Sequence, residues 1–317
     1  MILVDFHAVV FSNLHLIAKD SPGKAAGFIK SNPKDADIES DLSDLRGMVL
    51  NSLRRYRRLF SKDFGELVLC CDSNNSWRKE VRDAYRYRGF AYYKANRKKA
   101  RDATGINWKQ VFSSLEVILD ELQANFPYKI IKVDRAEADD LVATICHNFG
   151  SKGLRMAKSE GIKIISRDKD FGQLQVYANV SQYDPITNKP VLINNPEEYL
   201  HEHIMRGDTV DGVPNFLSDD DTLVVKGKRS KSLRAEMVNT WMSMKPQDIC
   251  ADDDKLMANW DRNKRVISLE YNDIPEYIRV AVAKIWEQDL PVSDRSKLMT
   301  YFTKNRLRNL IPNMGEF

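Results

Sequence analysis

Residues 66–72 read Glu-Leu-Val-Leu-Cys-Cys-Asp, an almost unbroken apolar run that ends in a carboxylate. A short run of this kind is typical of a strand buried on both faces of a parallel sheet. Residues 1–5 and 162–168 repeat the pattern and end at Asp5 and Asp168, and residues 128–133 are also predicted to form a strand. Helical periodicity over 42–60, 107–126 and 136–149 separates the runs. The alternation predicts an α/β fold with a mainly parallel, twisted sheet and helices on both faces.

The chain changes character after about residue 194, because no further strand pattern follows. Short helical patterns continue from there to the end of the sequence. We therefore predict an α/β domain over residues 1–195 and a smaller, all-helical domain over residues 196–317.

Composition excludes several classes of protein. Hydrophobic residues make up 43% and charged residues 30% of the chain, as in ordinary soluble globular proteins. No apolar stretch reaches membrane-spanning length and the chain starts with a strand pattern, so we expect neither a membrane protein nor a signal peptide. The four cysteines lack CxxC spacing, which predicts buried free thiols in a reducing cytoplasm. The histidines complete no nucleophilic triad, and no glycine-rich phosphate loop is present.

Acidic residues follow the predicted strands at Asp5, Asp72 and Asp168. Taken singly, each is most simply a helix N-cap or a turn residue. Because the carboxyl ends of parallel strands meet at one edge of a sheet, however, these side chains are expected to lie together. Further acids are expected at the same edge, in the helix start Glu137-Ala138-Asp139-Asp140, at Asp170, and in the pair Asp208 and Asp211.

Carboxylates that converge on one point repel each other unless cations lie between them. A set of oxygen ligands without histidine or cysteine selects Mg²⁺, or Mn²⁺ in its place, over zinc. So many acids can hold two ions ~4 Å apart, the arrangement that serves phosphoryl transfer. The pattern therefore predicts a magnesium site that acts on a phosphodiester.

A basic segment from Arg78 to Arg101 contains ten lysines and arginines and only two acids, Glu80 and Asp83. Such a segment is most often a solvated surface, but this one also contains Tyr85, Tyr87, Phe90, Tyr92 and Tyr93. Aromatic rings among cations suit a nucleic-acid strand, because bases stack while phosphates pair with charge. Lys94 and Arg97 share one face if the segment is helical, where they can neutralise a phosphate in the transition state.

The order of these motifs resembles that of the 5′-nuclease, or flap endonuclease, superfamily, including its phage members. The resemblance rests on the strand ending at Asp5, VLCCD ending at Asp72, FAYYKANR ending at Arg97, AEADD ending at Asp140, SRDKDFGQL from Ser166 and GDTVDGVP from Gly207. It covers nearly the whole chain. It implies a Mg²⁺-dependent 5′-to-3′ exonuclease and flap endonuclease for RNA·DNA and DNA·DNA duplexes, which removes RNA primers from lagging-strand fragments during DNA replication.

The resemblance also implies roles for residues of this chain. The first metal site carries over to Asp5, Asp72, Asp139 and Asp168, with Glu137 beside it, and the second to Asp170, Asp208 and Asp211. Asp140 matches a position behind the ligands. Asp139, Asp168, Lys94 and Arg97 are expected to be catalytic.

The nucleic-acid contacts implied by the resemblance lie in an arch at about residues 73–105 and in a helix-turn-helix-like region at about 207–240. The residues expected to bind nucleic acid are Arg78, Arg86, Tyr93, Lys94, Arg97, Lys226, Lys228 and Arg229. The spacing after Asp72 fits either Tyr93-Lys94 or Tyr85-Arg86 as the Tyr-Lys motif of the arch. Only Gly227 remains of the glycines of the family's potassium-binding hairpin, so a potassium site stays open.

The implied partners are nucleic acids with a 5′ end, flap or fork and a single-stranded-DNA-binding protein; contact with a sliding clamp stays open. The expected state is a monomer in the cytoplasm of a phage-infected bacterium, without membrane contact. Two rival hypotheses remain: a catalytically silent protein that binds flaps or forks, and a PIN-type ribonuclease. The complete acidic set disfavours the first, and the long arch with its C-terminal helices disfavours the second.

Overall fold

The structure is a computed structural model that describes residues 1–20, 38–80, 90–104, 106–151, 160–290, 292 and 294–317. Its centre is a six-stranded sheet with the strand order β3-β2-β1-β4-β5-β6. The strands are β1 (Ile2–Asp5), β2 (Leu67–Cys71), β3 (Lys129–Lys132), β4 (Ile162–Ile165), β5 (Val180–Asp184) and β6 (Lys189–Val191). Neighbouring strands are parallel, except that β6 runs antiparallel to β5. The predicted fold class is confirmed.

The two strands that the sequence analysis does not predict, β5 and β6, lie at one edge of the sheet. In β5, buried and partly exposed residues alternate, so the continuous apolar run of the central strands is missing. β6 is short, largely exposed and contains Pro190, which sheets tolerate at an edge strand. Half-buried edge strands leave a weak hydrophobic signal in a sequence, and the prediction missed them for that reason.

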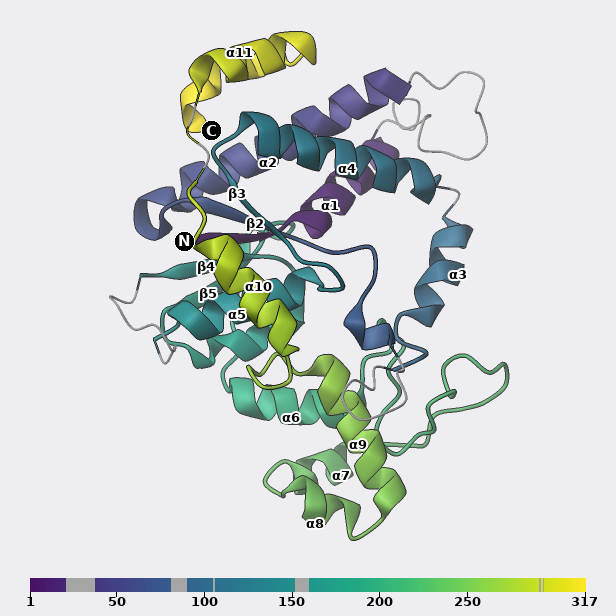
Figure 1. Cartoon of the computed structure of the whole chain (residues 1–317). Coiled ribbons are helices and arrows are strands. Elements are labelled where there is room, and N and C mark those ends of the chain that lie inside the picture. Colours follow the sequence, from purple (N-terminus) through teal and green to yellow (C-terminus); the bar gives the residue numbers. More distant parts are fainter. Residues whose placement is uncertain (21–37, 81–89, 105, 152–159, 291, 293) are drawn as a thin grey trace.

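Helices cover both faces of the sheet (Figure 1). Ile2, Val4, Leu67 and Leu69 pack into a core with three helices, α1 (Phe6–Asp20), α2 (Ile38–Phe64) and α4 (Trp108–Asn125). The alternate residues Leu3, Val68 and Cys70 pack with α5 (Ala138–Phe149) and α10 (Glu276–Trp286) on the other face. Successive side chains of a strand point to opposite faces, so a strand covered twice must be apolar throughout.

The C-terminal helices divide into two groups. α6 (Pro196–Arg206), α7 (Ala235–Trp241), α8 (Pro246–Cys250) and α9 (Asp254–Ile267) share a separate core around Phe216 and Trp260. α10 instead packs on the sheet, and α11 (Arg295–Lys304) with the 3₁₀ segment η4 (Arg308–Glu316) packs against α2 and α4. Phe302 and Phe317 belong to the core that α1, α2 and α4 form with the sheet. The last helices therefore close over the α/β part of the chain.

Within the helix-turn-helix-like region expected at about 207–240, the structure has turns over residues 207–234 and a helix from Ala235. This stretch contains Pro214 and the run Ser218-Asp219-Asp220-Asp221, whose backbone closes turns at Thr222 and Val224. Proline removes an amide donor, and short acidic side chains favour turns over helix interiors, so the local sequence opposes a helix here.

The expected arch at 73–105 is described in part. The 3₁₀ segment η2 (Trp77–Lys79) follows β2, and α3 (Ala95–Ala103) leads into α4 (Figure 1). Residues 81–89 and 105 lie outside the described residues, and with them Arg86 and the alternative register Tyr85-Arg86.

Two predictions from composition can be compared with the structure. Cys70, Cys71, Cys146 and Cys250 are buried and free, as predicted. Among the helices of the described residues, none combines the length and the apolar character needed to cross a membrane.

Candidate active site

The ends of β1, β2 and β4 and the start of α5 bring together four carboxylates, the first acidic group (Asp5, Asp72, Asp139 and Asp168). Asp5 Oδ1 accepts a hydrogen bond from the amide of Ala8 at 3.1 Å. Asp72 Oδ1 accepts one from the amide of Ala138 at 2.7 Å, which ties the end of β2 to the first turn of α5. Asp139 lies in that same turn. Backbone donors thus hold the acids at one edge of the sheet.

Burial and neighbouring carboxylates raise the pKa of three of these acids, Asp5, Asp139 and Asp168. Burial, together with the nearby Asp72 and Asp168, raises the pKa of Asp5 to about 7. Burial and the charge of Asp170 raise the pKa of Asp168 to about 6. Burial and Asp168 likewise raise the pKa of Asp139. In the part of the chain that the structure describes, no lysine, arginine or histidine forms an ion pair with Asp5, Asp139 or Asp168. Among the described residues, the positive charge that acts on Asp139 and Asp168 is that of nearby Lys94, which lowers their pKa without outweighing burial and the neighbouring acids.

A second acidic group (Asp170, Asp208 and Asp211) adjoins the first. Asp170 lies in the first turn of the 3₁₀ segment η3 (Lys169–Val176), whose N-cap is Asp168, and the other two acids lie in the turn after α6. Asp208 Oδ1 accepts hydrogen bonds from the amides of Val210 at 2.7 Å and of Asp211 at 3.1 Å. Burial and the neighbouring Asp211 and Asp170 raise the pKa of Asp208. The two groups therefore form one continuous acidic cluster.

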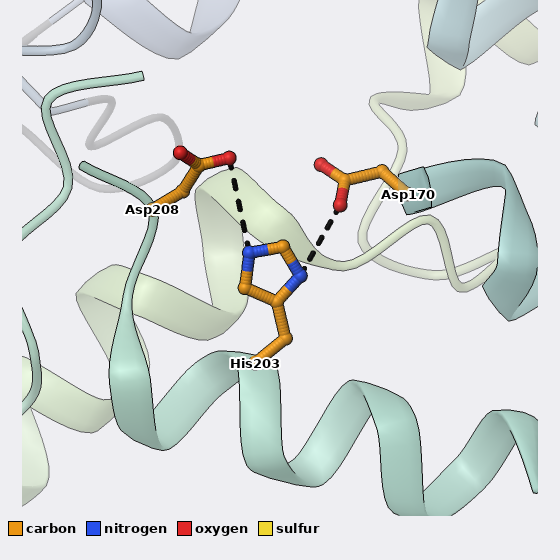
Figure 2. A group of neighbouring side chains, drawn as sticks. All are labelled: Asp170, His203 and Asp208. Atoms are coloured by element: carbon orange, nitrogen blue, oxygen red, sulfur yellow. Dashed lines mark ion pairs between the residues drawn. The ribbon is translucent and has the colours of Figure 1, made fainter. Parts of the chain in front are cut away.

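His203 lies between two of these acids (Figure 2). Its Nδ1 is 3.1 Å from Asp170 Oδ1, and its Nε2 is 3.8 Å from Asp208 Oδ2. Burial acts to lower the pKa of His203, but contact with Asp170 and the charge of Asp208 outweigh it and raise the pKa. Asp170, His203 and Asp208 each offer one ligand atom within 4.8 Å of the others, so this group can hold a metal ion.

Three residues of the predicted arch, Tyr93, Lys94 and Arg97, contact Glu137 and Asp211 of the site. Lys94 Nζ lies 2.7 Å from Glu137 Oε1 and 3.6 Å from Asp211 Oδ2. The Tyr93 hydroxyl lies 2.9 Å from both Glu137 Oε2 and Asp211 Oδ2 and donates its one proton between them, and Arg97 forms an ion pair with Asp211. Although burial opposes it, the charges of Lys94 and Arg78 lower the pKa of Glu137 to about 2.

The backbone around Lys94 is joined to the turn that carries the second acidic group. The amide of Lys94 donates to the carbonyl of Asp211 at 2.6 Å, and Asn96 Nδ2 donates to the carbonyl of Thr209 at 2.8 Å. Gly212 has a φ of +75°, and a Cβ there would lie 3.0 Å from the carbonyl oxygen of Tyr92. Lys94 itself has a φ of 56°, a left-handed conformation that costs a non-glycine residue ~1 kcal/mol or more. These close contacts place Lys94 beside the acids.

Asp140 is fully buried at the start of α5. Its carboxylate contacts the guanidinium of Arg78 at 2.8 Å and accepts a hydrogen bond from Trp77 Nε1 at 3.0 Å. Arg78 also contacts Glu137 at 3.1 Å and donates to the carbonyl of Val266 in α9 at 3.0 Å. Arg78 is only 1% exposed, so the expectation that it contacts nucleic acid does not fit its position. It instead joins the start of α5 to α9.

The remaining predicted contacts are placed as follows. Tyr93 is 3% exposed, so its ring is packed in the protein and only its hydroxyl faces the acids. Lys226 and Arg229 are exposed in the loop between α6 and α7. Lys228 of the same loop pairs with Asp219 at 3.0 Å and with Asp221.

Sequence reasoning missed His203 and Tyr199. Both lie on α6, four residues apart, and their rings meet edge to face with centroids 5.7 Å apart. Burial and the negative charge of Asp170 raise the pKa of Tyr199. The spacing of four residues on a helix that ends just before Gly207-Asp208 is the signal that could have found them, because side chains at this spacing share one face.

Comparison with known proteins places the chain in a family. The family model of the 5′-3′ exonuclease N-terminal resolvase-like domain matches residues 41–204, and that of the T4 RNase H C-terminal region matches residues 194–317. The chain belongs to the 5′-3′ exonuclease family. It is similar to Ribonuclease H of Enterobacteria phage T4, with 30% identity over 284 residues that span 87% of this chain and 88% of that protein. The predicted class, a 5′ nuclease related to phage enzymes, is confirmed.

Solved structures share the fold. A structure of the T5 5′-exonuclease with bound zinc matches 90% of this chain and 98% of its own, with 15% identity and a TM-score of 0.56. A phage T5 flap endonuclease in complex with DNA and metal ions matches 90% of this chain and 99% of its own, again with 15% identity and a TM-score of 0.56. At this identity the likeness supports the architecture: a mostly parallel sheet with C-terminal helices.

Proposed function

We propose that this 5′ nuclease is Mg²⁺-dependent, with Mn²⁺ as a substitute, and that it hydrolyses phosphodiesters of RNA·DNA and DNA·DNA duplexes. It acts from 5′ ends as an exonuclease and on 5′ flaps as an endonuclease, and it removes RNA primers from lagging-strand fragments. The single observation that carries the proposal is the clustering of Asp5, Asp139 and Asp168, with which no described basic side chain forms an ion pair.

The donor set fits hard divalent cations. The first acidic group offers only carboxylate oxygens, the ligands that Mg²⁺ and Mn²⁺ prefer. Asp5, Asp72, Asp139 and Asp168 would hold one ion and Asp170, Asp208 and Asp211 a second, with Glu137 beside them. Ions bound there would supply an activated water and neutralise charge on the reacting phosphate. Their charge would also lower the raised pKa values of the acids, so that all carboxylates ionise together.

Two cationic side chains assist the reaction in this proposal. Lys94 is charged at neutral pH because Glu137 and Asp211 raise its pKa against the effect of burial. Arg97 is 44% exposed at its side chain and lies beside Asp211. A scissile phosphate that entered the cluster would meet both cations, which would stabilise the negative charge that grows in the transition state. Tyr93 positions Glu137 and Asp211 rather than stacking on a base.

The substrate would be held by its phosphates and its 5′ end. Lys94 and Arg97 of the expected arch lie beside the acids, which supports threading or clamping of a single strand there, and the exposed Lys226 and Arg229 would contact duplex phosphates. Such contacts give affinity without sequence choice. A single-stranded-DNA-binding protein and a sliding clamp are the proposed partners in replication, and the proposed setting is the cytoplasm of a phage-infected bacterium, where the protein acts as a monomer.

The decisive experiment follows cleavage of two duplexes that differ only in a labelled 5′ flap of RNA or of DNA. Each is incubated with Mg²⁺, with Mn²⁺ and with EDTA, using the wild-type chain and Asp168→Asn. We expect cleavage with either ion, none with EDTA, and binding without cleavage by the variant. The lengths of the labelled products distinguish the two activities, because an exonuclease releases short products from the 5′ end and a flap endonuclease releases the flap in one piece.

Three outcomes would contradict the proposal. Full cleavage in EDTA would exclude metal dependence. Tight flap binding by the wild-type chain without cleavage in either metal would favour the silent flap-binding protein, and cleavage of single-stranded RNA alone would favour the PIN-type ribonuclease.

A further inference from the structure

The metal-binding geometry of the second acidic group includes a nitrogen atom. His203 Nδ1 is 3.1 Å from Asp170 Oδ1, and Nε2 faces Asp208 at 3.8 Å (Figure 2). The three side chains come from separate segments: η3, α6 and the turn that follows α6. A local sequence pattern does not explain this convergence, which the packing of α6 against η3 brings about.

The contact between His203 and Asp170 is a close ion pair. His203 Nδ1 is buried and has no hydrogen bond of acceptable geometry among the described residues, despite its 3.1 Å distance from the carboxylate oxygen. Two ligands bound at right angles to one ion at ~2.1 Å lie ~3.0 Å from each other, because the distance is √2 times the bond length. The observed separation, which is also that of an ordinary ion pair, therefore allows both atoms to bind one ion without moving apart.

The imidazole ring is also held in place. Tyr199, one turn earlier on α6, packs edge to face against it with ring centroids 5.7 Å apart, and the side chain of His203 is only 15% exposed. A ligand whose rotamer is fixed by packing loses little conformational freedom when it binds an ion.

We propose that His203 is a nitrogen ligand of the second metal ion, together with oxygens of Asp170 and Asp208. The inference rests on the proposed metal-dependent function and sharpens it, because it makes the two metal positions chemically different. The first acidic group supplies oxygens alone, whereas an imidazole ligand favours Mn²⁺ and Co²⁺ over Mg²⁺. His203 would then determine which ion this position selects.

The test detects the nitrogen itself. Mn²⁺ is added to the full chain, and pulsed electron paramagnetic resonance records the coupling of ¹⁴N to the bound ion. Three samples are compared: wild type, wild type grown with ¹⁵N-histidine, and His203→Gln. The matched control is His201→Gln, since His201 lies on the same helix but contacts the carbonyl of Trp241 at 3.1 Å, outside the acidic cluster.

We expect a ¹⁴N coupling in the wild type that changes to the ¹⁵N pattern with the isotope, disappears in His203→Gln and persists in His201→Gln. Mn²⁺ affinity at one of two positions should fall on the order of tenfold or more in His203→Gln. Mg²⁺ affinity should fall less. A coupling that is absent in the wild type, or that persists in His203→Gln, overturns the proposal.

A variant that fails to fold would not block the test. His203→Asp replaces the nitrogen by an oxygen and is expected to keep two bound Mn²⁺ ions while losing the ¹⁴N coupling; a coupling retained in it also overturns the proposal. Failure of the proposed function looks different, because the wild type would then bind no Mn²⁺ at the acids and Asp168→Asn would leave Mn²⁺ binding unchanged.

Discussion

The two acidic groups of the site differ in how the protein balances their charge. Asp5, Asp139 and Asp168 of the first group are held by the sheet and the start of α5 and have no ion-pair partner among the described residues. The second group lies on η3 and on a turn, and its members contact His203, Tyr93, Lys94 and Arg97. The difference indicates that the first group depends on added cations, whereas the second is partly neutralised by the chain itself.

The largest expected effect tests that difference directly. Asp139→Asn should lower kcat on a flap substrate by about 10³-fold or more, because it removes a group that acts on the reacting phosphate. Asp208→Asn should cost less and should recover when Mg²⁺ is raised, since His203 and Asp170 remain. A loss of equal size in both variants that raised Mg²⁺ does not reverse would remove the distinction between the groups.

The next largest effect concerns the support behind the first group. Arg78→Met leaves Glu137 and Asp140 without their buried guanidinium, and breaking a buried ion pair costs about 3–5 kcal/mol of the free energy of unfolding. Urea unfolding followed by circular dichroism measures the change. The control is Arg206→Met, whose exposed pair with Glu202 should be worth less than about 0.5 kcal/mol. Similar losses in the two variants would mean that Arg78 has no special structural role.

A substitution at Lys94 tests whether its positive charge, which lies beside Asp211 of the second acidic group, assists the reaction. Lys94→Gln removes the ammonium that contacts Glu137 and Asp211, and we expect kcat to fall by about 10²-fold. Binding of a flap duplex should weaken much less. Lys109→Gln, an exposed position on α4, serves as the control in single-turnover cleavage assays. Unchanged cleavage by Lys94→Gln would assign the assisting role to another cation.

The pH dependence of the free energy of unfolding tests the first acidic group without any substitution. The folded pKa of Asp5 and of Asp168 is raised above 3.8, to about 7 and about 6, so the metal-free protein is most stable while both are protonated. This contribution is present below about pH 4 and is lost as the pH rises to about 7, at about 1.4 kcal/mol for each unit by which a pKa is raised.

Thermal melts at several pH values measure this loss. Mg²⁺ should cancel it, because the ion binds the ionised carboxylates, and Asp168→Asn should reduce it. Without metal, we expect the change in stability from pH 4 to pH 7 to be more favourable in Asp168→Asn than in the wild type, because the variant has lost one carboxyl group whose ionisation destabilises the folded protein. Identical pH profiles for the wild type and the variant would show that Asp168 does not titrate in this range.

The smallest effect is expected far from the acids. Lys226→Ala with Arg229→Ala should weaken duplex binding by about tenfold or less and reduce the slope of log K against log salt by roughly two, about one per lost phosphate contact. Lys228→Ala should do less, because its ammonium already pairs with Asp219 and Asp221. Fluorescence anisotropy over a salt series measures both, and an unchanged slope would show that this loop does not contact phosphates.

Much of the first acidic group could be predicted from local sequence. A carboxylate after each central apolar run must lie at the carboxyl edge of a parallel sheet, so Asp5, Asp72 and Asp168 were predictable together. Arg78 could not be placed in this way. Its neighbours in the sequence are basic and aromatic, but its partners Asp140 and Val266 lie in α5 and α9, and only their packing shows that the guanidinium is buried.

The sequence by itself determined the layered α/β core, because the hydrophobic period of each segment is a local property. It also determined that the acids after the strands gather, because parallel strands place their carboxyl ends at one edge of the sheet. Tertiary packing alone decided that α6 presents His203 to Asp170 and Asp208, that the Lys94 backbone is joined to the turn at Asp211, and that α10 and α11 return to the sheet. These contacts join residues far apart in the chain, and their geometry depends on how whole elements pack.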